Sequence, residues 1–152
     1  MLVERFESGA SSGDVVPPRR PLVLVVDDDE VLCTVLEYNL SKEGFEVRLA
    51  HTGAQALELL EQFTPDLLLI DWMLPAVSGV EVCRRARAEP RLSRLPILMV
   101  SALDGQADRD CGLRMGADEY VSKPFALAPL IDRAHALLAG TRAGRSFRSD
   151  DN

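Results

Sequence analysis

Short apolar runs of strand length alternate along this chain with segments of helical periodicity. The runs at 22–26, 67–70 and 96–100 are rich in aliphatic residues and show no alternation of polar and apolar positions. A strand of that kind is covered on both faces, which is typical of a parallel sheet with helices on either side. The chain is therefore predicted to fold as an α/β domain and not as an all-helical or all-β one.

Five strand–helix units follow one another in series. The segment 45–49 alternates apolar and polar residues, as expected for a strand nearer a sheet edge, and a short fifth strand is predicted at 119–122. Helical patterns follow the strands at 30–42, 52–63, 78–88, 104–115 and 127–138. Strands that alternate with helices predict a doubly wound parallel sheet with right-handed crossovers.

Several residues mark where these helices begin and end. Thr52 and Ser78 are candidate N-caps, and Gly44 is the expected residue just after the first helix. The fourth helix is polar, and its thin apolar stripe is predicted to consist of Ala107, Cys111 and Met115.

The two ends of the chain differ in composition from the part between them. Ser, Gly, Pro and charged residues dominate 1–20 and 141–152, which offer too little apolar surface to offset the entropy of ordering. We expect a disordered N-terminal extension at 1–20, one domain at 21–140, and a C-terminal tail or truncated linker at 141–152. A stand-alone protein and one part of a longer protein both fit this pattern.

The overall charge and the apolar content argue against several function classes. A formal net charge of -7 disfavours non-specific attraction to nucleic acid or to an anionic membrane. No apolar run is long enough to span a bilayer, and the first residues lack the basic and apolar regions of a secretory signal. We expect a cytoplasmic protein whose chain neither enters a membrane nor binds nucleic acid directly.

The three cysteines favour a reducing compartment over a disulfide or zinc framework. They are Cys33, Cys83 and Cys111, which are widely spaced and include no CxxC pair. The two histidines, His51 and His135, do not stand at zinc-ligand spacing from them. Buried or partly buried free thiols are predicted.

Polar residues follow four of the predicted strands at the point where each strand ends. Asp27 and Asp28 follow the first strand, Asp71 the third and Ser101 the fourth, and Lys123 comes after the fifth. In an open α/β sheet, ligands bind outside the carboxyl ends of the strands. Three carboxylates, a hydroxyl and an ammonium are therefore expected to converge at one edge.

Each of these residue types suits one part of a phosphoryl-transfer site. Carboxylates a few ångström apart repel one another, so the three acids need a cation, for which Mg²⁺ is the best fit and Mn²⁺ the alternative. An aspartate can act as a nucleophile and form an acyl phosphate, while Lys123 and Ser101 can stabilise the added group. Taken singly, each residue also has a plain structural reading as a helix cap, a turn residue or a solvated surface group.

Four stretches of the sequence resemble the receiver domains of two-component response regulators. They are LVLVVDDDE, PDLLLIDWMLPAVSG, PILMVSA and GADEYVSKPF, and the resemblance covers 21–140. The resemblance implies a flavodoxin-like fold with a five-stranded sheet in the order 2-1-3-4-5. It also implies a phosphorylation-dependent signalling switch of a two-component phosphorelay, which accepts its phosphoryl group from a histidine kinase or a histidine phosphotransfer protein.

The same resemblance assigns a role to each residue of the acidic edge. Asp71 would be the phosphoacceptor. Asp28 would bind Mg²⁺ directly, Asp27 mostly through water, and the backbone carbonyl of Met73 would be a further ligand.

A second group of residues would respond to the phosphoryl group. Ser101 would be the switch hydroxyl, Tyr120 the switch aromatic that turns inward, and Lys123 the phosphoryl contact, followed by a cis bond to Pro124. The face built by 104–115, 119–122 and 127–138 would then repack.

The segment Asp71–Pro75 particularly resembles the OmpR/PhoB-type subfamily, whose members commonly dimerise through that same face by charged pairs. Residues at matching charged positions are Arg109, Asp118, Glu119 and Arg133. Pro129 stands where an acidic partner for Arg109 is usual, so we expect a weakened or altered homodimer.

Two apolar residues bear on how long the acyl phosphate lasts. Met73 and Leu103 lie two residues after Asp71 and Ser101, at positions that influence attack by water in this family. Apolar side chains there hinder water, so slow autodephosphorylation is expected. The chain would then be a phosphoacceptor that catalyses its own phosphotransfer, and not a multiple-turnover enzyme.

Three other functions compete with this interpretation. A haloacid-dehalogenase-type phosphatase would use the Asp27–Asp29 motif and Ser101, but the chain offers no obvious cap and Asp71 would have no role. A nucleotide- or flavin-binding protein would need a Gly-rich first loop, where this chain has acids. A pseudo-receiver that only binds partners would not require the full set of acids, hydroxyl and lysine.

Overall fold

The computed structural model describes residues 19–150, and side-chain environments up to residue 140. The predicted N-terminal extension therefore lies outside the described residues, apart from its last two. Arg19 forms an ion pair with Asp66 (3.1 Å), and Arg20 donates to the backbone carbonyl of Phe45 (2.7 Å). These contacts join the start of the described chain to the domain.

Five parallel strands form one sheet in the order β2-β1-β3-β4-β5, which confirms the predicted topology. The strands are β1 (Leu22–Val26), β2 (Glu46–Ala50), β3 (Leu67–Asp71), β4 (Ile97–Ser101) and β5 (Glu119–Ser122). Because β1 pairs with both β2 and β3, the strand order reverses beside it and opens a crevice at the carboxyl ends.

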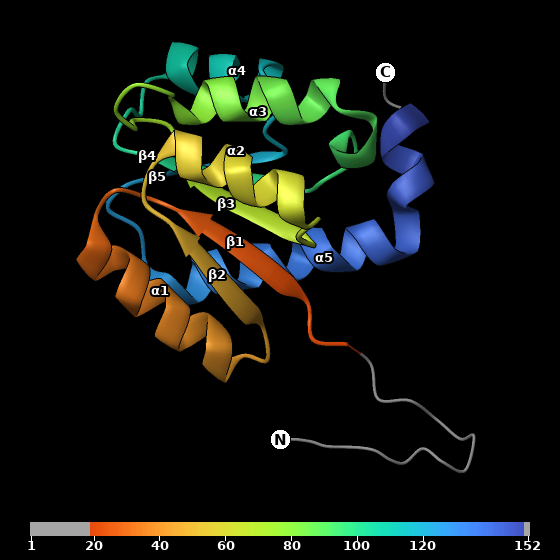
Figure 1. Cartoon of the computed structure of the whole chain (residues 1–152), viewed down its shortest axis with the longest axis horizontal. Coiled ribbons are helices and arrows are strands. Elements are labelled where there is room, and N and C mark those ends of the chain that lie inside the picture. The colour runs from red at the N-terminus through yellow and green to blue at the C-terminus, as the bar shows by residue number, and fades with distance from the viewer. Residues whose placement is uncertain (1–18, 151–152) are drawn as a thin grey trace.

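Two layers of helices cover the sheet (Figure 1). The helices are α1 (Glu30–Lys42), α2 (Gly53–Gln62), α3 (Gly79–Ala88), α4 (Gln106–Arg114) and α5 (Leu127–Asp150), with a short 3₁₀ turn η2 (Pro90–Leu92). Helices α1 and α5 pack on one face, and α2, α3 and α4 lie on the other. The result is the doubly wound α/β architecture expected from the strand and helix patterns.

The central strands bury alternate residues in two separate cores. In β1, Leu24 and Val26 face α2 and α3, whereas Val23 and Val25 face α1 and α5. All four are fully buried, which explains the absence of polar alternation in the sequence. Truncation of a leucine such as Leu24 to alanine would cost about 2–5 kcal/mol of stability.

Side-chain caps set the starts of three helices. Asp29, Thr52 and Ser78 each accept a hydrogen bond from a backbone amide in the first turn of α1, α2 and α3 respectively. Gly44 has a φ of 97° just after α1, as its predicted C′ position requires.

The prediction for the apolar stripe of α4 was wrong in part. Ala107 is exposed, Cys111 is half-buried, and Met115 is the C-cap. The one fully buried residue of the helix is Gly112, because the ring of Tyr120 occupies the space beside it. A Cβ at Gly112 would lie 2.8 Å from Cδ2 of that ring, so the helix packs through its backbone.

Helix α5 continues to Asp150, beyond the boundary predicted at residue 140. Arginine has high helix propensity, and it recurs in 141–150 at positions 142, 145 and 148 despite the glycine at 144. Within 19–150, none of the helices combines the length and apolar character that crossing a membrane would require.

Candidate functional site

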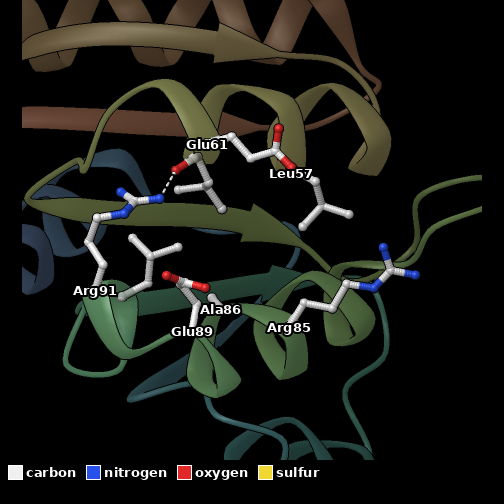
Figure 2. Close-up of a pocket in the computed structure, with 8 residues that line it drawn as sticks. Leu57, Glu61, Arg85, Ala86, Glu89 and Arg91 are labelled. Carbon is white, nitrogen blue, oxygen red and sulfur yellow. Dashed lines mark hydrogen bonds between the residues drawn. The ribbon is translucent and has the colours of Figure 1, made fainter.

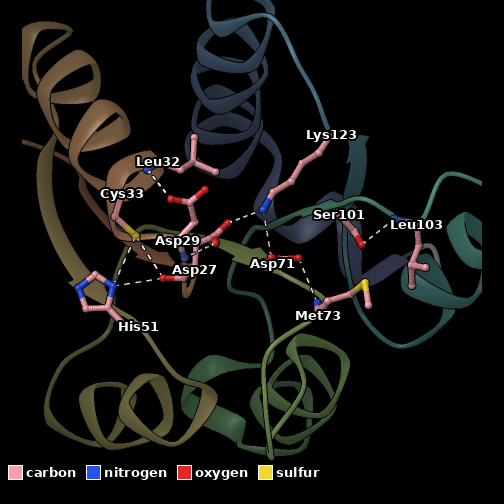
Figure 3. Close-up of polar contacts among 10 residues, drawn as sticks. All are labelled: Asp27, Asp29, Leu32, Cys33, His51, Asp71, Met73, Ser101, Leu103 and Lys123. Atoms are coloured by element: carbon pink, nitrogen blue, oxygen red, sulfur yellow. Dashed lines mark hydrogen bonds and ion pairs between the residues drawn. The ribbon is translucent and has the colours of Figure 1, made fainter.

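The parallel sheet brings the predicted polar residues together at its carboxyl edge (Figure 3). Asp71 and Ser101 are the last residues of β3 and β4, and Asp27 directly follows β1. Lys123 comes just after β5 and reaches back over the edge. The peptide bond from Lys123 to Pro124 is cis, as predicted.

Three aspartates form the acidic centre of this edge. One carboxylate oxygen each from Asp27, Asp28 and Asp71 can lie within 4.8 Å of the others. Asp27 and Asp71 are only 2% and 5% exposed, whereas Asp28 is exposed. Oxygen ligands at this density, partly open to solvent, suit a hard divalent cation that keeps some of its waters.

Lys123 offsets part of the negative charge. Its Nζ lies 2.8 Å from Oδ2 of Asp27 and 3.0 Å from Oδ2 of Asp71. Burial lowers the pKa of Lys123, but the hydrogen bonds that it donates to Asp27 and Asp71 outweigh that effect and raise the pKa overall. In formal charges, three carboxylates and one ammonium leave two negative charges in excess, which a divalent cation would neutralise.

Asp71 is held by two donors. Its Oδ1 accepts from the backbone amide of Met73 (3.0 Å), and its Oδ2 accepts from Lys123. Burial raises the pKa of Asp71 above its usual value, the charge of Asp27 adds to this effect, and Met73 and Lys123 oppose it. Met73 thus contacts Asp71 through its backbone amide. The role of its carbonyl as a magnesium ligand stays a prediction.

The loop after β3 depends on close backbone approach. The amide of Gly79 donates to the carbonyl of Trp72 (2.8 Å), which folds the loop back under Asp71. A Cβ at Gly79 would lie 2.0 Å from the carbonyl oxygen of Asp71, so only glycine fits.

Ser101 and Tyr120 meet at Leu103. Ser101 is fully buried, and its Oγ accepts from the amide of Leu103 (3.1 Å). Tyr120 is only 6% exposed and donates its hydroxyl to the carbonyl of Leu103 (2.6 Å). Burial raises the pKa of the Tyr120 hydroxyl. The predicted switch aromatic thus occupies the inward position in this structure.

Trp72 links this aromatic to the acidic centre, and sequence reasoning gave it no role. Its ring meets that of Tyr120 edge-on, with centroids 6.2 Å apart at 84°. The direct adjacency of Trp72 to Asp71 in the sequence is the signal that could have drawn attention to it.

Arg109 of the predicted dimer face lies against Tyr120. Its Nη1 donates to the carbonyl of Tyr120 (3.1 Å), and the guanidinium carbon lies 5.4 Å from the centre of the ring. The cation–π contact and the hydrogen bond hold Arg109 to its own β5.

The other three charged residues of that face also have partners within the chain. Oδ2 of Asp118 accepts from the amide of Ile97 (2.7 Å) and pairs with Arg87 (3.1 Å). Glu119 of β5 pairs with Arg133 of α5.

Two further hollows lie on the described part of the molecule. One, of about 320 Å³, lies between α2, α3 and η2, and is lined by leucines and by the charged side chains of Glu61, Glu89 and Arg91 (Figure 2). None of the predicted site residues borders it. The other, of about 470 Å³ and mostly apolar, is bounded by Lys123 and by residues of α1 and the β5–α5 loop such as Val35 and Phe125.

Comparison with known proteins identifies the family. The response regulator receiver domain family matches residues 23–135. The chain belongs to this family. Its sequence is 48% identical over 118 residues to the phosphate regulon transcriptional regulatory protein PhoB of Rhizobium meliloti (strain 1021), covering 78% of this chain and 52% of the relative. The receiver domain described here thus spans about half the length of that curated relative.

Solved structures agree with this assignment. A response regulator from Chloroflexus aurantiacus J-10-fl superposes with a TM-score of 0.76 at 36% identity, over 80% of this chain and 99% of the other. The receiver domain of Francisella response regulator 1452 gives 0.75 at 32% identity, over 80% and 98%. The receiver domain of sensor histidine kinase PA1611 from Pseudomonas aeruginosa PAO1, solved with a magnesium ion in its active-site cleft, gives 0.73 at 32% identity, over 80% and 99%.

Proposed function

We propose that this receiver domain accepts a phosphoryl group on Asp71 from a histidine kinase or a histidine phosphotransfer protein, in the presence of Mg²⁺. One observation carries the proposal: Asp27, Asp28 and Asp71 converge with Lys123 at the carboxyl edge of the sheet. A structural salt bridge would not need a third acid beside one ammonium, whereas a phosphoryl-transfer site needs both a cation site and a fixed positive charge.

Asp27, Asp28 and Asp71 would hold the magnesium ion, with the carbonyl of Met73 as a further ligand. All are oxygen donors, and the exposure of Asp28 leaves one side of the site open to waters and to the incoming group. When bound, the ion supplies charge neutralisation for the phosphoryl oxygens. The magnesium described for the PA1611 receiver domain supports this assignment.

Asp71 serves as the nucleophile. One of its carboxylate oxygens forms a bond to phosphorus while the phosphorus–nitrogen bond of the donor breaks, and the donor imidazole keeps that electron pair. Lys123 already touches Asp71 at 3.0 Å, so a small movement of Nζ transfers its contact to the phosphoryl oxygens. Lys123 then stabilises the negative charge on those oxygens.

The switch passes from Ser101 to the α4–β5–α5 face. The Ser101 hydroxyl accepts from the amide of Leu103, and its proton can turn toward a phosphoryl oxygen. Since Tyr120 donates to the carbonyl of the same Leu103, a shift of Ser101 acts on the ring that packs against Arg109 and Gly112. Helix α4, with one buried residue and no side-chain N-cap, is the element that moves most easily.

Dimerisation through that face is weak. Arg109, Asp118, Glu119 and Arg133 each have partners within the chain, which a dimer would have to replace. Sedimentation with and without beryllofluoride tests this point. We expect a mainly monomeric domain in both conditions, and a tight activated dimer would contradict it.

The acyl phosphate lasts long because two apolar side chains border it. Met73 is 53% exposed beside Asp71, and Leu103 lies beside Ser101. Neither can orient a water for attack. A Met73→Asn, Leu103→Glu variant should lose phosphate faster than the parent, and an unchanged rate would refute this explanation.

The phosphatase alternative finds no support at its own motif. Asp29, the second acid of the Asp27–Asp29 pair, accepts from the amide of Leu32 as the N-cap of α1. It is thus committed to a helix terminus and is not free to act as a general acid.

The test is intact mass after incubation with Mg²⁺ and acetyl phosphate or phosphoramidate. We expect one phosphoryl group per chain, which requires Mg²⁺ and is absent from Asp71→Ala. Turnover of many equivalents of a phosphate ester would instead favour the phosphatase, and no adduct with any small donor or histidine-phosphorylated protein would overturn the proposal.

A further inference from the structure

Three residues hold the backbone of Asp27. Its amide donates to the carbonyl of Ala50 at the end of β2 (3.1 Å). Its carbonyl oxygen accepts from Sγ of Cys33 in α1 (3.3 Å) and lies 3.2 Å from Nδ1 of His51, which follows β2 (Figure 3). The peptide that carries the first acid of the site is therefore fixed by side chains outside the acidic centre.

The side chain of Asp27 is fixed as well. Oδ1 accepts from the amide of Asp29 (2.9 Å), and Oδ2 accepts from Lys123 (2.8 Å). Every polar atom of Asp27 thus has a partner. A change at the carbonyl end would rotate the peptide and, with it, the carboxylates of the whole 27–29 turn.

The partners of the Asp27 carbonyl must be hydrogen-bond donors. A carbonyl oxygen only accepts, so Nδ1 of His51 carries the proton when it bonds to Asp27, and the thiol of Cys33 is the second donor. Sγ and Nδ1 also lie 3.7 Å apart, within hydrogen-bond distance for sulfur. Asp27 is buried, so loss of these donors would leave its carbonyl without a partner.

We propose that His51 and Cys33 are positioning residues for the magnesium site, because their donation to the Asp27 carbonyl directs the carboxylates of Asp27 and Asp28 toward Asp71. This inference rests on the proposed function. Removal of a hydrogen-bond donor that supports a metal-ligating residue typically lowers the metal affinity by about 10–100-fold. His51 contributes the greater part, since a nitrogen donor makes a stronger hydrogen bond than a thiol.

The test compares His51→Ala with His51→Asn, whose side-chain amide can donate from nearly the same place as Nδ1. The control is His135→Ala, the other histidine of the chain, which lies on α5 and pairs with Glu43 at the end of α1. Trp72, the one tryptophan, directly follows Asp71, so we use its fluorescence as the expected reporter of Mg²⁺ binding. The phosphorylation rate with acetyl phosphate is measured over a range of Mg²⁺ concentrations, and the urea midpoint is measured in EDTA.

We expect His51→Ala to raise the Mg²⁺ dissociation constant about tenfold, while the rate at saturating Mg²⁺ changes by less than about twofold. His51→Asn should recover most of the affinity, and His135→Ala should match the parent. Cys33→Ser, which keeps a donor, should bind Mg²⁺ more tightly than Cys33→Ala.

Two results would overturn the inference alone. One is a parent-like Mg²⁺ affinity in His51→Ala while the parent binds Mg²⁺ and is phosphorylated normally. The other is a loss of Mg²⁺ affinity that is equal in His51→Asn and His51→Ala and that follows the fall in their urea midpoints. That result would assign His51 a role in folding only. A parent that neither binds Mg²⁺ nor accepts phosphate would overturn the proposed function, and this inference with it.

Discussion

Replacement of Lys123 by methionine should destabilise the domain strongly in the absence of Mg²⁺. Lys123 makes ion pairs of 2.8 and 3.0 Å with Asp27 and Asp71, whose side chains are only 4% and 7% exposed. Methionine keeps much of the side-chain volume but leaves both buried carboxylates without their cation. Breaking a buried pair from one side costs about 3–5 kcal/mol, which lowers the melting temperature by roughly 10–20 °C.

Added Mg²⁺ and a second substitution each show whether the stability loss in Lys123→Met comes from electrostatics or from packing. If the loss comes from unpaired carboxylates, millimolar Mg²⁺ should restore more stability to Lys123→Met than it adds to the parent. Asp71→Asn in the same background should also recover stability, because it removes one of the two charges. The matched control is Lys42→Met, the other lysine, which lies over the ring of Tyr38 on the surface of α1 and should cost less than about 1 kcal/mol.

The assay is urea unfolding followed by Trp72 fluorescence and circular dichroism, in EDTA and in Mg²⁺. A Lys123→Met variant within about 1 kcal/mol of the parent in EDTA would refute the argument. So would a Mg²⁺ effect no larger in the variant than in the parent.

Three further predictions follow from other contacts. Gly112→Ala should place a Cβ 2.8 Å from the Tyr120 ring and displace it, costing about 1–3 kcal/mol and increasing tyrosine exposure in solvent-perturbation spectra. Burial raises the pKa of the Cys33 thiol to about 11, so at pH 8 a thiol reagent should modify the half-exposed Cys111 well before Cys33, and both rapidly in urea. Hydrogen bonds from two neighbouring arginines lower the pKa of Glu81 from 4.5 to about 2, so its stabilising effect is present above pH 4.5 and lost as the pH falls toward 2. The unfolding stabilities of Glu81→Gln and the parent should therefore converge across that window, and a constant difference would contradict this.

Local signals in the sequence predicted the elements that carry the site. The aliphatic runs placed β1, β3 and β4 to within a residue, and Thr52 and Ser78 cap the helices that were assigned to them. The convergence of Asp71 with Lys123 was also predictable, because parallel strands bring their carboxyl ends to one edge.

Contacts between distant segments could not be predicted in the same way. Cys33 and His51 meet at the carbonyl of Asp27 although no spacing in the sequence relates them. The burial of Gly112 depends on where the Tyr120 ring lies, which a helical period cannot show. These features arise from packing between elements, whereas the strands and caps arise from residues close in sequence.

The central claim is that Asp71 itself receives the phosphoryl group. The most direct measurement is reduction of the phosphorylated protein with borohydride, which converts an aspartyl phosphate to homoserine, followed by peptide mass spectrometry. We expect homoserine at position 71, dependent on Mg²⁺ and absent from Asp71→Asn. Homoserine at Asp27 or Asp28, or a phosphoryl group on a residue that borohydride does not reduce, would contradict it.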